Sequence, residues 1–399
     1  MTSRSDAVSG LEHGSADLDA LHARIAPRFR RAEARARVRR YLDGLLGPIE
    51  RKNGWQMAEY LDETGPQGVQ RLLNAADWDA EAVRDELRAY VIEHVGEESG
   101  VLIVDETGFL KKGTKSAGVA RQYSGTAGRR ENQQIGVFLA YASPRGCAFL
   151  DRALYLPEVW TSDAQRRAEA GIPEDVGFAT KGQLAQTMLA RVFAANVPAR
   201  WVTGDAVYGH DELRRWLEEH GRSYVLAVAC THLIWTAGRQ EEVQSLAATL
   251  AADAWTRLSA GMGSQGPRWY DWACLRLPYD ARSGMAHWLL IRRDRNDPTG
   301  VAYYRVYAPA DTPIPEMVRV AGMRWAIEGA LEQAKGEVGL DQYEVRRWEA
   351  WYRHITLALL AHAFLEVTRA RSVADTTEKG EGLANASPSP SPKSAAYSG

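Results

Sequence analysis

The chain has 399 residues, of which 45% are hydrophobic and 25% charged, a balance typical of globular proteins rather than of disordered or fibrous ones. No apolar run approaches the roughly 18 residues of a membrane span, and the polar start MTSRSDAVSG lacks the apolar core of a signal peptide, so we expect a cytoplasmic protein. The formal net charge of −2 excludes no polyanionic partner, because an average hides local segregation of charge, and three scattered cysteines without a C-x-x-C spacing argue against a zinc site or a disulfide framework.

The first 95 residues have a helical pattern. Apolar residues recur there at three- and four-residue spacing among Ala, Leu, Arg and Glu. Between residues 24 and 52, ten Lys or Arg stand against three acids, which would suit a polyanion. The pattern predicts a helical domain over 1–95 that binds DNA. A dimerisation or packing module with a solvated basic face fits the same pattern.

From residue 96 short β-branched strands alternate with helices, and the first two strands are connected by a basic, glycine-rich segment at 109–133. Strands are predicted at 100–107, 133–143, 147–157, 199–205 and 223–229, and helices at 181–196 and 210–221. This order predicts an α/β core with a mixed sheet and flanking helices over 96–234.

The remainder of the chain divides into three parts. Aromatic strand-like pieces at 267–277, 287–293 and 301–308 predict a β-rich insertion over 235–310. Helical patterns return at 315–337 and about 349–370, so we expect C-terminal helices of the core over 311–370. The segment 371–399, with its low-complexity end NASPSPSPKSAAYSG, is expected to be a disordered tail.

Two of the predicted strands end in aspartate, LIVD at Asp105 and WVTGD at Asp205. Open α/β sheets place their sites beyond the carboxyl ends of strands, and strand order often brings two such ends together. A third acid, Glu328, would share one helical face with Arg324 and Lys335, which lie four residues before it and seven after it.

Three carboxylates from separate elements suit divalent metal ions, since Mg²⁺ prefers oxygen ligands and bridges to phosphate oxygens. Two such ions can activate a water or a 3′-hydroxyl and stabilise the leaving oxygen of a phosphodiester. Taken alone, a strand-end aspartate is more often a turn or N-cap residue and a mid-helix glutamate a solvated one, although Asp211 is better placed to cap the helix after Asp205. The combination of three acids with basic loops favours the metal site.

The segments LIVDETGFLKKG, WVTGDAVYGHDELRRWLEEHG and RWAIEGALEQAKGEVGLDQYEVRRWEAWYRH resemble the DDE transposases of bacterial insertion sequences, in the subgroup with a β insertion before the final glutamate. The resemblance covers roughly residues 20–370. It implies an RNase H-like catalytic fold and two Mg²⁺ or Mn²⁺ ions. It also implies that Asp105, Asp205 and Glu328 are the catalytic, metal-binding triad.

The subgroup has a signature of tyrosine, arginine, glutamate and lysine. In this chain the arginine, glutamate and lysine correspond to Arg324, Glu328 and Lys335, whereas Ala321 stands at the position of the tyrosine. The resemblance therefore implies phosphate contacts by Arg324 and Lys335, with one contact altered at Ala321. Further DNA contacts are expected from the basic segment, through Lys111, Lys112, Lys115, Arg129 and Arg130. Three tryptophans are candidates for stacking on a flipped base, although a place in the core fits each equally well: Trp269, Trp272 and Trp288.

The predicted function is DNA transposition: hydrolysis at each transposon end, then attack of the freed 3′-hydroxyl on target DNA, in a synaptic homodimer that binds double-stranded DNA and no membrane. Such a protein would be nucleoid-associated when bound to DNA. One alternative is a transposase relic that binds DNA without cutting it. Another is an unrelated hydrolase with paired carboxylates, such as a glycosidase, which would leave the basic loops unexplained.

Overall fold

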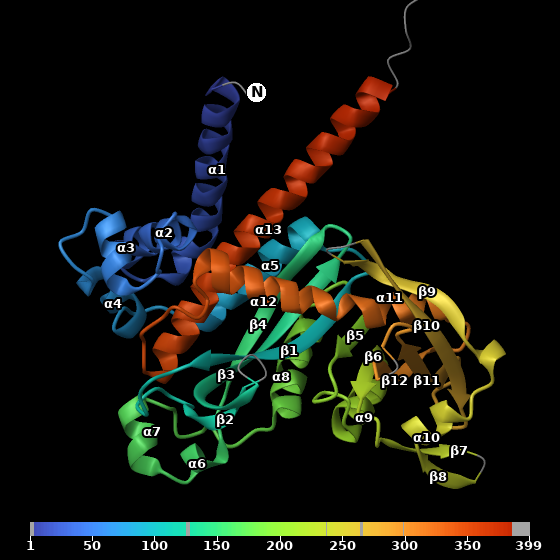
Figure 1. Cartoon of the computed structure of the whole chain (residues 1–399). Coiled ribbons are helices and arrows are strands. Elements are labelled where there is room, and N and C mark those ends of the chain that lie inside the picture. Colours follow the sequence, from blue (N-terminus) through green and yellow to red (C-terminus); the bar gives the residue numbers. More distant parts are fainter. Residues whose placement is uncertain (1–3, 125–127, 237, 264–265, 298, 385–399) are drawn as a thin grey trace, which may run out of the picture.

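The computed structural model describes residues 4–124, 128–236, 238–263, 266–297 and 299–384 (Figure 1). The chain begins with a group of helices that pack around one apolar core. Their bounds are α1 Arg4–Ile25, η1 Ala26–Arg28, α2 Ala32–Leu46, α3 Gly54–Tyr60, α4 Gln67–Asn74 and α5 Ala80–Val95. The helical pattern predicted for this region is therefore present in the fold.

A mixed sheet of ten strands forms the centre of the molecule, in the order β2-β3-β1-β5-β6-β12-β11-β10-β9 with β4 also paired to β3. Its strands are β1 Val101–Leu110, β2 Ala120–Ser124, β3 Arg129–Ser143, β4 Gly146–Tyr155, β5 Trp201–Gly204, β6 Ser223–Val228, β9 Thr256–Gly263, β10 Gly266–Leu277, β11 Met285–Arg293 and β12 Val301–Pro309. β1, β5 and β6 run parallel to one another, and the other pairings are antiparallel. The prediction of a mixed α/β fold is confirmed.

The β-rich segment after β6 continues this sheet, because β12 pairs with β6 from Tyr303↔Val228 to Tyr307↔Tyr224. A separate hairpin, β7 Leu233–Thr236 with β8 Arg239–Glu242, lies beside α10 Val243–Ala248 and η2 Ala252–Ala254. The division of the chain into domains stays a prediction.

Helices cover both faces of the sheet (Figure 1). The helices that contact the sheet are α5, α8 Lys181–Ala194, α9 Asp211–Glu219, α11 Ile314–Met323, α12 Trp325–Val338 and α13 Trp348–Ala384. Two short helices, α6 Glu158–Thr161 and α7 Ala164–Ala170, pack on each other after β4. Side chains alternate between the two faces of a strand, and β1 shows which helix lies on which face. Thr107 contacts Lys335 of α12, whereas its neighbour Glu106 contacts Lys181 of α8. α12 and α8 thus lie on opposite faces.

Several boundaries differ from the predictions. The basic segment 109–133, expected as a connection, contains β2 and the beginning of β3. The single helix predicted at 315–337 is divided at Arg324, which keeps helical angles (φ −51°, ψ −36°).

Two further expectations were wrong. His210, not Asp211, takes the N-cap position of α9, because Asp211 is already helical and its carboxylate binds Arg214. The expected start of a tail at 371 is not observed, because α13 continues to Ala384 and contains no proline. Residues 385–399, the rest of that predicted tail, lie outside the described residues.

Among the helices that the structure describes, not one is both long and apolar enough to cross a membrane.

Candidate active site

Asp105 and Asp205 lie side by side at one point of the sheet. β1 and β5 are parallel neighbours whose register pairs Val104 with Gly204, and an aspartate is the next residue of the chain in each case. Asp205 follows the end of β5, whereas Asp105 lies in the middle of β1, so the expectation that this strand ends in aspartate was wrong. Both strands are buried apolar runs that carry the acids to the sheet centre. A Cβ at Gly204 would meet the Val104 carbonyl oxygen and the Tyr208 side chain at 3.2 Å each, so glycine permits this close approach.

Burial and mutual repulsion make both aspartates poor acids. Burial, followed by the negative charge of Asp205, raises the pKa of Asp105 to about 7. Burial also raises the pKa of Asp205, and the nearby carboxylate of Glu106 adds to that effect. One backbone amide donates to each carboxylate, at 2.8 Å from Glu106 and 2.9 Å from Val207, and lowers its pKa only in part. The two carboxylates therefore lack enough positive charge beside them to offset burial and their mutual repulsion.

Glu328 approaches this pair from α12, in company with Arg324. Arg324 Nη1 lies 2.7 Å from Glu328 Oε1 and 4.0 Å from Asp105 Oδ2, so its guanidinium stands between the two acids. Among the described residues, no three His, Cys, Asp or Glu side chains are grouped closely enough to hold one ion together. The structure thus brings the two aspartates together, and it connects Glu328 to Asp105 only through the Arg324 guanidinium.

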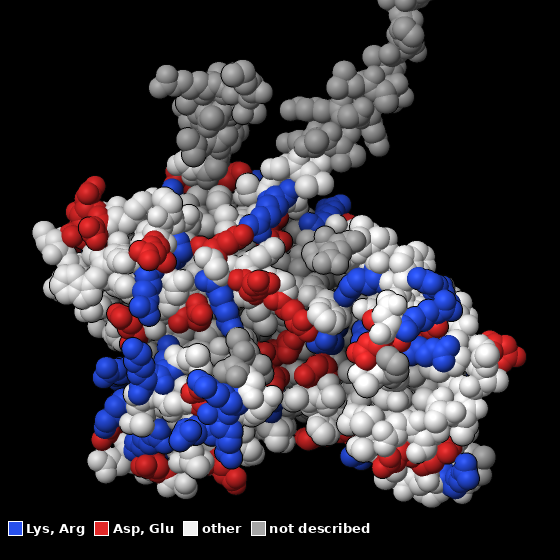
Figure 2. Space-filling view, in the orientation of Figure 1, with Lys and Arg blue, Asp and Glu red and all other residues white. Residues whose placement is uncertain are grey.

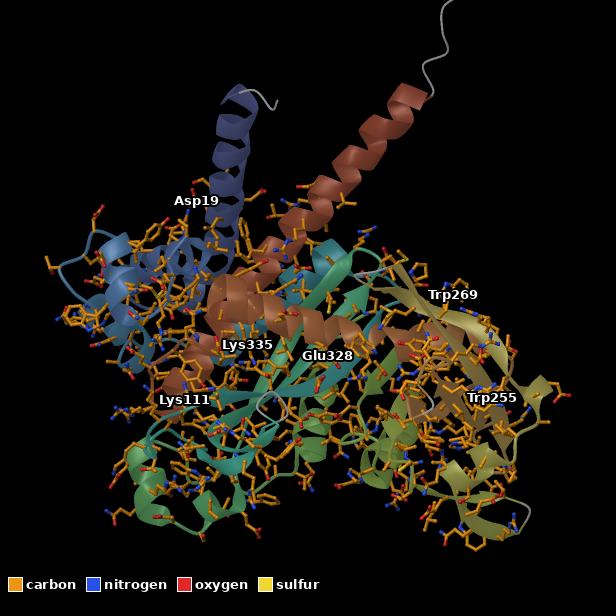
Figure 3. All side chains as sticks on the ribbon, in the orientation of Figure 1. Asp19, Lys111, Trp255, Trp269, Glu328 and Lys335 are labelled. Atoms are coloured by element: carbon orange, nitrogen blue, oxygen red, sulfur yellow. The ribbon has the colours of Figure 1, made fainter. Side chains whose placement is uncertain are left out.

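Lys335 lies farther along α12, on the same face of β1 as Asp105. Its Nζ donates to the Thr107 hydroxyl at 2.7 Å, and burial lowers its pKa. Figure 3 shows Glu328 and Lys335 along α12, in front of β1. The predicted arginine, glutamate and lysine of this helix are therefore aligned along the strand that carries Asp105.

Sequence reasoning missed a second carboxylate arrangement behind the first. Glu106 receives a hydrogen bond from the buried Tyr208 hydroxyl at 2.6 Å and pairs with Lys181 Nζ at 2.5 Å. These contacts join β1 to the loop after Asp205 and to the start of α8. The adjacent acids in LIVDE were a visible signal, but Lys181 is 75 residues away and no sequence pattern connects it to Glu106.

A groove of about 780 Å³ begins beside Arg324, between the β9–β10 hairpin and the junction of α11 and α12. Met262, Arg268 and the exposed Trp325 are among its lining residues. Trp325 was not among the predicted site residues, although it follows Arg324 directly in the chain.

The basic segment contributes unevenly to the surface. Lys112 and Arg130 are exposed, whereas Lys115 pairs with Glu169 and Arg129 with Glu131. Figure 2 shows Lys and Arg gathered over the region of β2 and α7.

Lys111 differs from these neighbours. It lies 3.4 Å above the Tyr343 ring, and burial lowers its pKa to about 8. Its Nζ also donates to the Tyr343 carbonyl oxygen at 3.2 Å, so Lys111 is fastened to the protein rather than extended into solvent.

Two of the three tryptophans proposed for base stacking are excluded by burial. The exposed fractions of Trp272 and Trp288 are 1% and 7%, because both rings pack in the core, so neither offers a face to a base. Trp269 is 51% exposed and lies on β10, where Figure 3 shows it at the outer part of the sheet. The expectation for Trp272 and Trp288 was wrong, and Trp269 remains.

The fold and these carboxylates define a class of protein. It has a mixed α/β sheet with two acids side by side on neighbouring parallel strands, and a third acid on a covering helix. A family model described as DDE superfamily endonuclease matches residues 24–249, more than half of the chain. The chain belongs to this family. It is also 24% identical over 308 residues, 76% of this chain and 75% of its relative, to a probable transposase for insertion sequence element IS701 of Microchaete diplosiphon.

Proposed function

We propose that this protein is the transposase of an insertion sequence, which hydrolyses phosphodiester bonds at the transposon ends and joins them to target DNA. The observation that carries the proposal is that Asp105 and Asp205 lie side by side on neighbouring parallel strands, with Glu328 of α12 connected to Asp105 through Arg324. Family membership and the transposase relative support the same reaction class.

The residues of the site fit divalent metal ions. Two buried carboxylates with raised pKa values lie together, and the nearest cation is 4.0 Å from Asp105 and already paired with Glu328. A hard divalent cation would neutralise this charge, and carboxylate oxygens are the ligands that Mg²⁺ and Mn²⁺ prefer. We therefore assign Asp105, Asp205 and Glu328 as catalytic residues that hold two such ions. The ions would activate the attacking oxygen and stabilise the leaving one.

The cationic side chains of α12 serve to hold DNA. Arg324 presents a guanidinium suited to bidentate phosphate binding, and Lys335 a point charge beside β1. For Arg324 to bind a phosphate, it must leave Glu328, which would free that carboxylate for the metal. Trp269 is the remaining candidate for stacking on an unpaired base.

The substrate is double-stranded DNA, both transposon ends and target, and the working unit is a homodimer that holds two ends together. The exposed Lys112 and Arg130 would contact the sugar-phosphate backbone, with Lys115 and Arg129 joining them after release from their acidic partners. We expect binding to weaken steeply with salt, as phosphate contacts require.

The test is cleavage of a supercoiled plasmid that carries the DNA flanking the gene. Wild-type protein is expected to nick at the element ends with Mg²⁺ or Mn²⁺ and not with EDTA. Asp205→Ala should abolish nicking while DNA binding persists. Asp253→Asn, which removes an exposed carboxylate far along the chain, is the matched control and should cut normally. Cleavage by the Asp205→Ala variant would refute the assignment of Asp205 as a catalytic residue.

One observation favours a second candidate, a DNA-binding relic without nuclease activity. Glu328 is bound to Arg324, and the described residues hold no ready group of three metal ligands. Salt-sensitive binding to the element ends without metal-dependent nicking would establish this alternative.

A further inference from the structure

Helix α4 presents a polar face that the packing of the N-terminal helices does not use. Gln67, Gln70, Arg71 and Asn74 are all exposed, and their spacing of three, four and seven residues places them on one side of the helix. The opposite side is buried in the core through Val69, Leu72 and Leu73.

These exposed side chains are almost free of partners inside the protein. Among the contacts of the described residues, only Asn74 is engaged, through a hydrogen bond of 2.9 Å from its amide to the Gln70 carbonyl oxygen of the same helix. Gln67, Gln70 and Arg71 have amide or guanidinium groups that face solvent. Such groups contribute little to folding from this position, so the face is available to a ligand.

The rest of the fold holds α4 rigidly in place. Asn53 caps α3 through hydrogen bonds of 3.0 Å from the backbone amides of Trp55 and Gln56, and the segment 61–66 leads from α3 into α4. The Arg37 guanidinium packs directly on Gly68 and pairs with Glu63, which fixes α4 against α2. Two short packed helices joined by a turn are the arrangement with which many proteins present a helix to DNA.

Arginines flank α4 on both sides. On one side a cleft of about 340 Å³ separates Gln70 and Asn74 from the exposed Arg346 and Arg347. On the other side a cleft of about 380 Å³ lies between Arg71 and α2, where Arg31 is exposed. A duplex whose groove receives α4 would therefore meet a cation at each bordering strand.

The cleft beside α4 also connects to the basic segment described above. The Arg346 carbonyl oxygen accepts a hydrogen bond of 2.8 Å from the Ala117 amide. Tyr343 lines the cleft, and the Lys111 ammonium lies over the Tyr343 ring. In Figures 1 and 2, α4 borders the part of the surface where Lys and Arg gather near β2. The polar face and the basic surface are thus neighbours.

We propose that α4 is the helix that reads DNA sequence, by placing Gln67, Gln70, Arg71 and Asn74 against base edges in the major groove of the transposon end. Gln and Asn can bind adenine through two hydrogen bonds, and Arg can bind guanine in the same way. The flanking arginines hold the two phosphate backbones. This inference rests on the proposed function, since it names what the transposase recognises.

The position of α4 relative to the acids fixes where the recognised bases lie. Lys111, at the α4 end of β1, is six residues from Asp105, or roughly 20 Å of strand. At about 3.4 Å per base pair, that length corresponds to roughly six base pairs. A duplex that runs along β1 would then place the bases read by α4 about six or more base pairs inside the cleaved end.

The experiment measures dissociation constants of the full-length protein by fluorescence anisotropy at one fixed salt concentration. One duplex carries the element end and the other a scrambled sequence of the same length. Gln70→Ala and Arg71→Ala are expected to reduce the preference for the element end on the order of tenfold, with scrambled DNA little affected. Gln240→Ala and Arg215→Ala remove exposed side chains of the same kinds elsewhere and should leave the preference unchanged.

Three results would overturn the assignment of α4. They are an unchanged preference in both variants, an equal loss on both duplexes, and a footprint confined to the outermost five base pairs. Circular dichroism is the control that these surface variants fold. The plasmid assay separates this inference from the proposed function. If the protein nicks the plasmid but the α4 variants keep their preference for the element end, only the role of α4 is refuted. If α4 is needed for specific binding but the protein does not nick, only the nuclease activity is refuted.

Discussion

The raised pKa of Asp105 would make the proposed metal binding dependent on pH in a range that can be measured. Only the ionised carboxylate binds a metal, so a proton competes with the ion at this site. With a pKa of about 7, Asp105 is about nine-tenths protonated at pH 6 and about one-tenth protonated at pH 8. The affinity of the site for a metal ion is therefore highest well above pH 7 and is lost as the pH falls through about 7. We expect about a tenfold weaker Mn²⁺ affinity at pH 6 than at pH 8, and the raised pKa of Asp205 acts in the same direction.

The assay is titration of the DNA-free protein with Mn²⁺, followed by the electron paramagnetic resonance signal of the free ion, at pH 6 and pH 8. Asp105→Asn removes the titrating group without changing its size, so we expect weak binding and a smaller pH dependence. Asp253→Asn should behave as wild type. A change of less than twofold in the wild type, or a tenfold change retained by Asp105→Asn, would refute the reasoning.

Three other substitutions test the surroundings of the site. Tyr208→Phe removes a buried hydrogen bond to the Glu106 carboxylate, and we expect the free energy of unfolding in urea to fall by about 2 kcal/mol. Gly209→Ala would place a Cβ 1.9 Å from a carbonyl oxygen of β6 and should destabilise the protein by about 3 kcal/mol. Gly336→Ala, where a Cβ meets open space, should stabilise the protein by about 0.5–1 kcal/mol. Equal melting temperatures of the two variants in calorimetry would contradict this. Arg324→Ala should raise the Mn²⁺ affinity of the DNA-free protein and lower DNA affinity, and a lower Mn²⁺ affinity would show that Arg324 does not compete with metal.

The positions of Asp105 and Asp205 could be predicted because the signals were local. Each acid follows a short apolar run, and sites of open α/β sheets usually lie beyond such runs, although β2, β3, β4 and three helices separate β1 from β5 in the chain. Periodicity likewise placed Arg324, Glu328 and Lys335 on one helical face before any tertiary contact was known. The sequence was informative where the signal lay within a single strand or helix.

The contacts that surround the acids could not be predicted, because they join elements far apart in the chain. Lys181 meets Glu106 only after α8 has packed on the sheet. The burial of Trp272 and Trp288 depends on which face of β10 and β11 is covered, and alternation alone leaves that choice open. The face of α4 needed the same information, since its polar side chains gain meaning only when Val69 and Leu72 are seen to be buried beneath them.

The register of β1 explains why the proposed metal position is at Asp105 rather than at the adjacent Glu106. Because neighbouring residues of a strand point to opposite faces, Asp105 faces α12 and Glu106 faces α8. On the α8 side, Lys181 and Tyr208 bind both oxygens of Glu106. On the α12 side, Asp105 has Asp205 beside it and an arginine already bound to another acid. On one face of the strand the protein itself neutralises the carboxylate. On the other face a negative charge remains, which a divalent cation would neutralise while it bridges the carboxylates to a DNA phosphate.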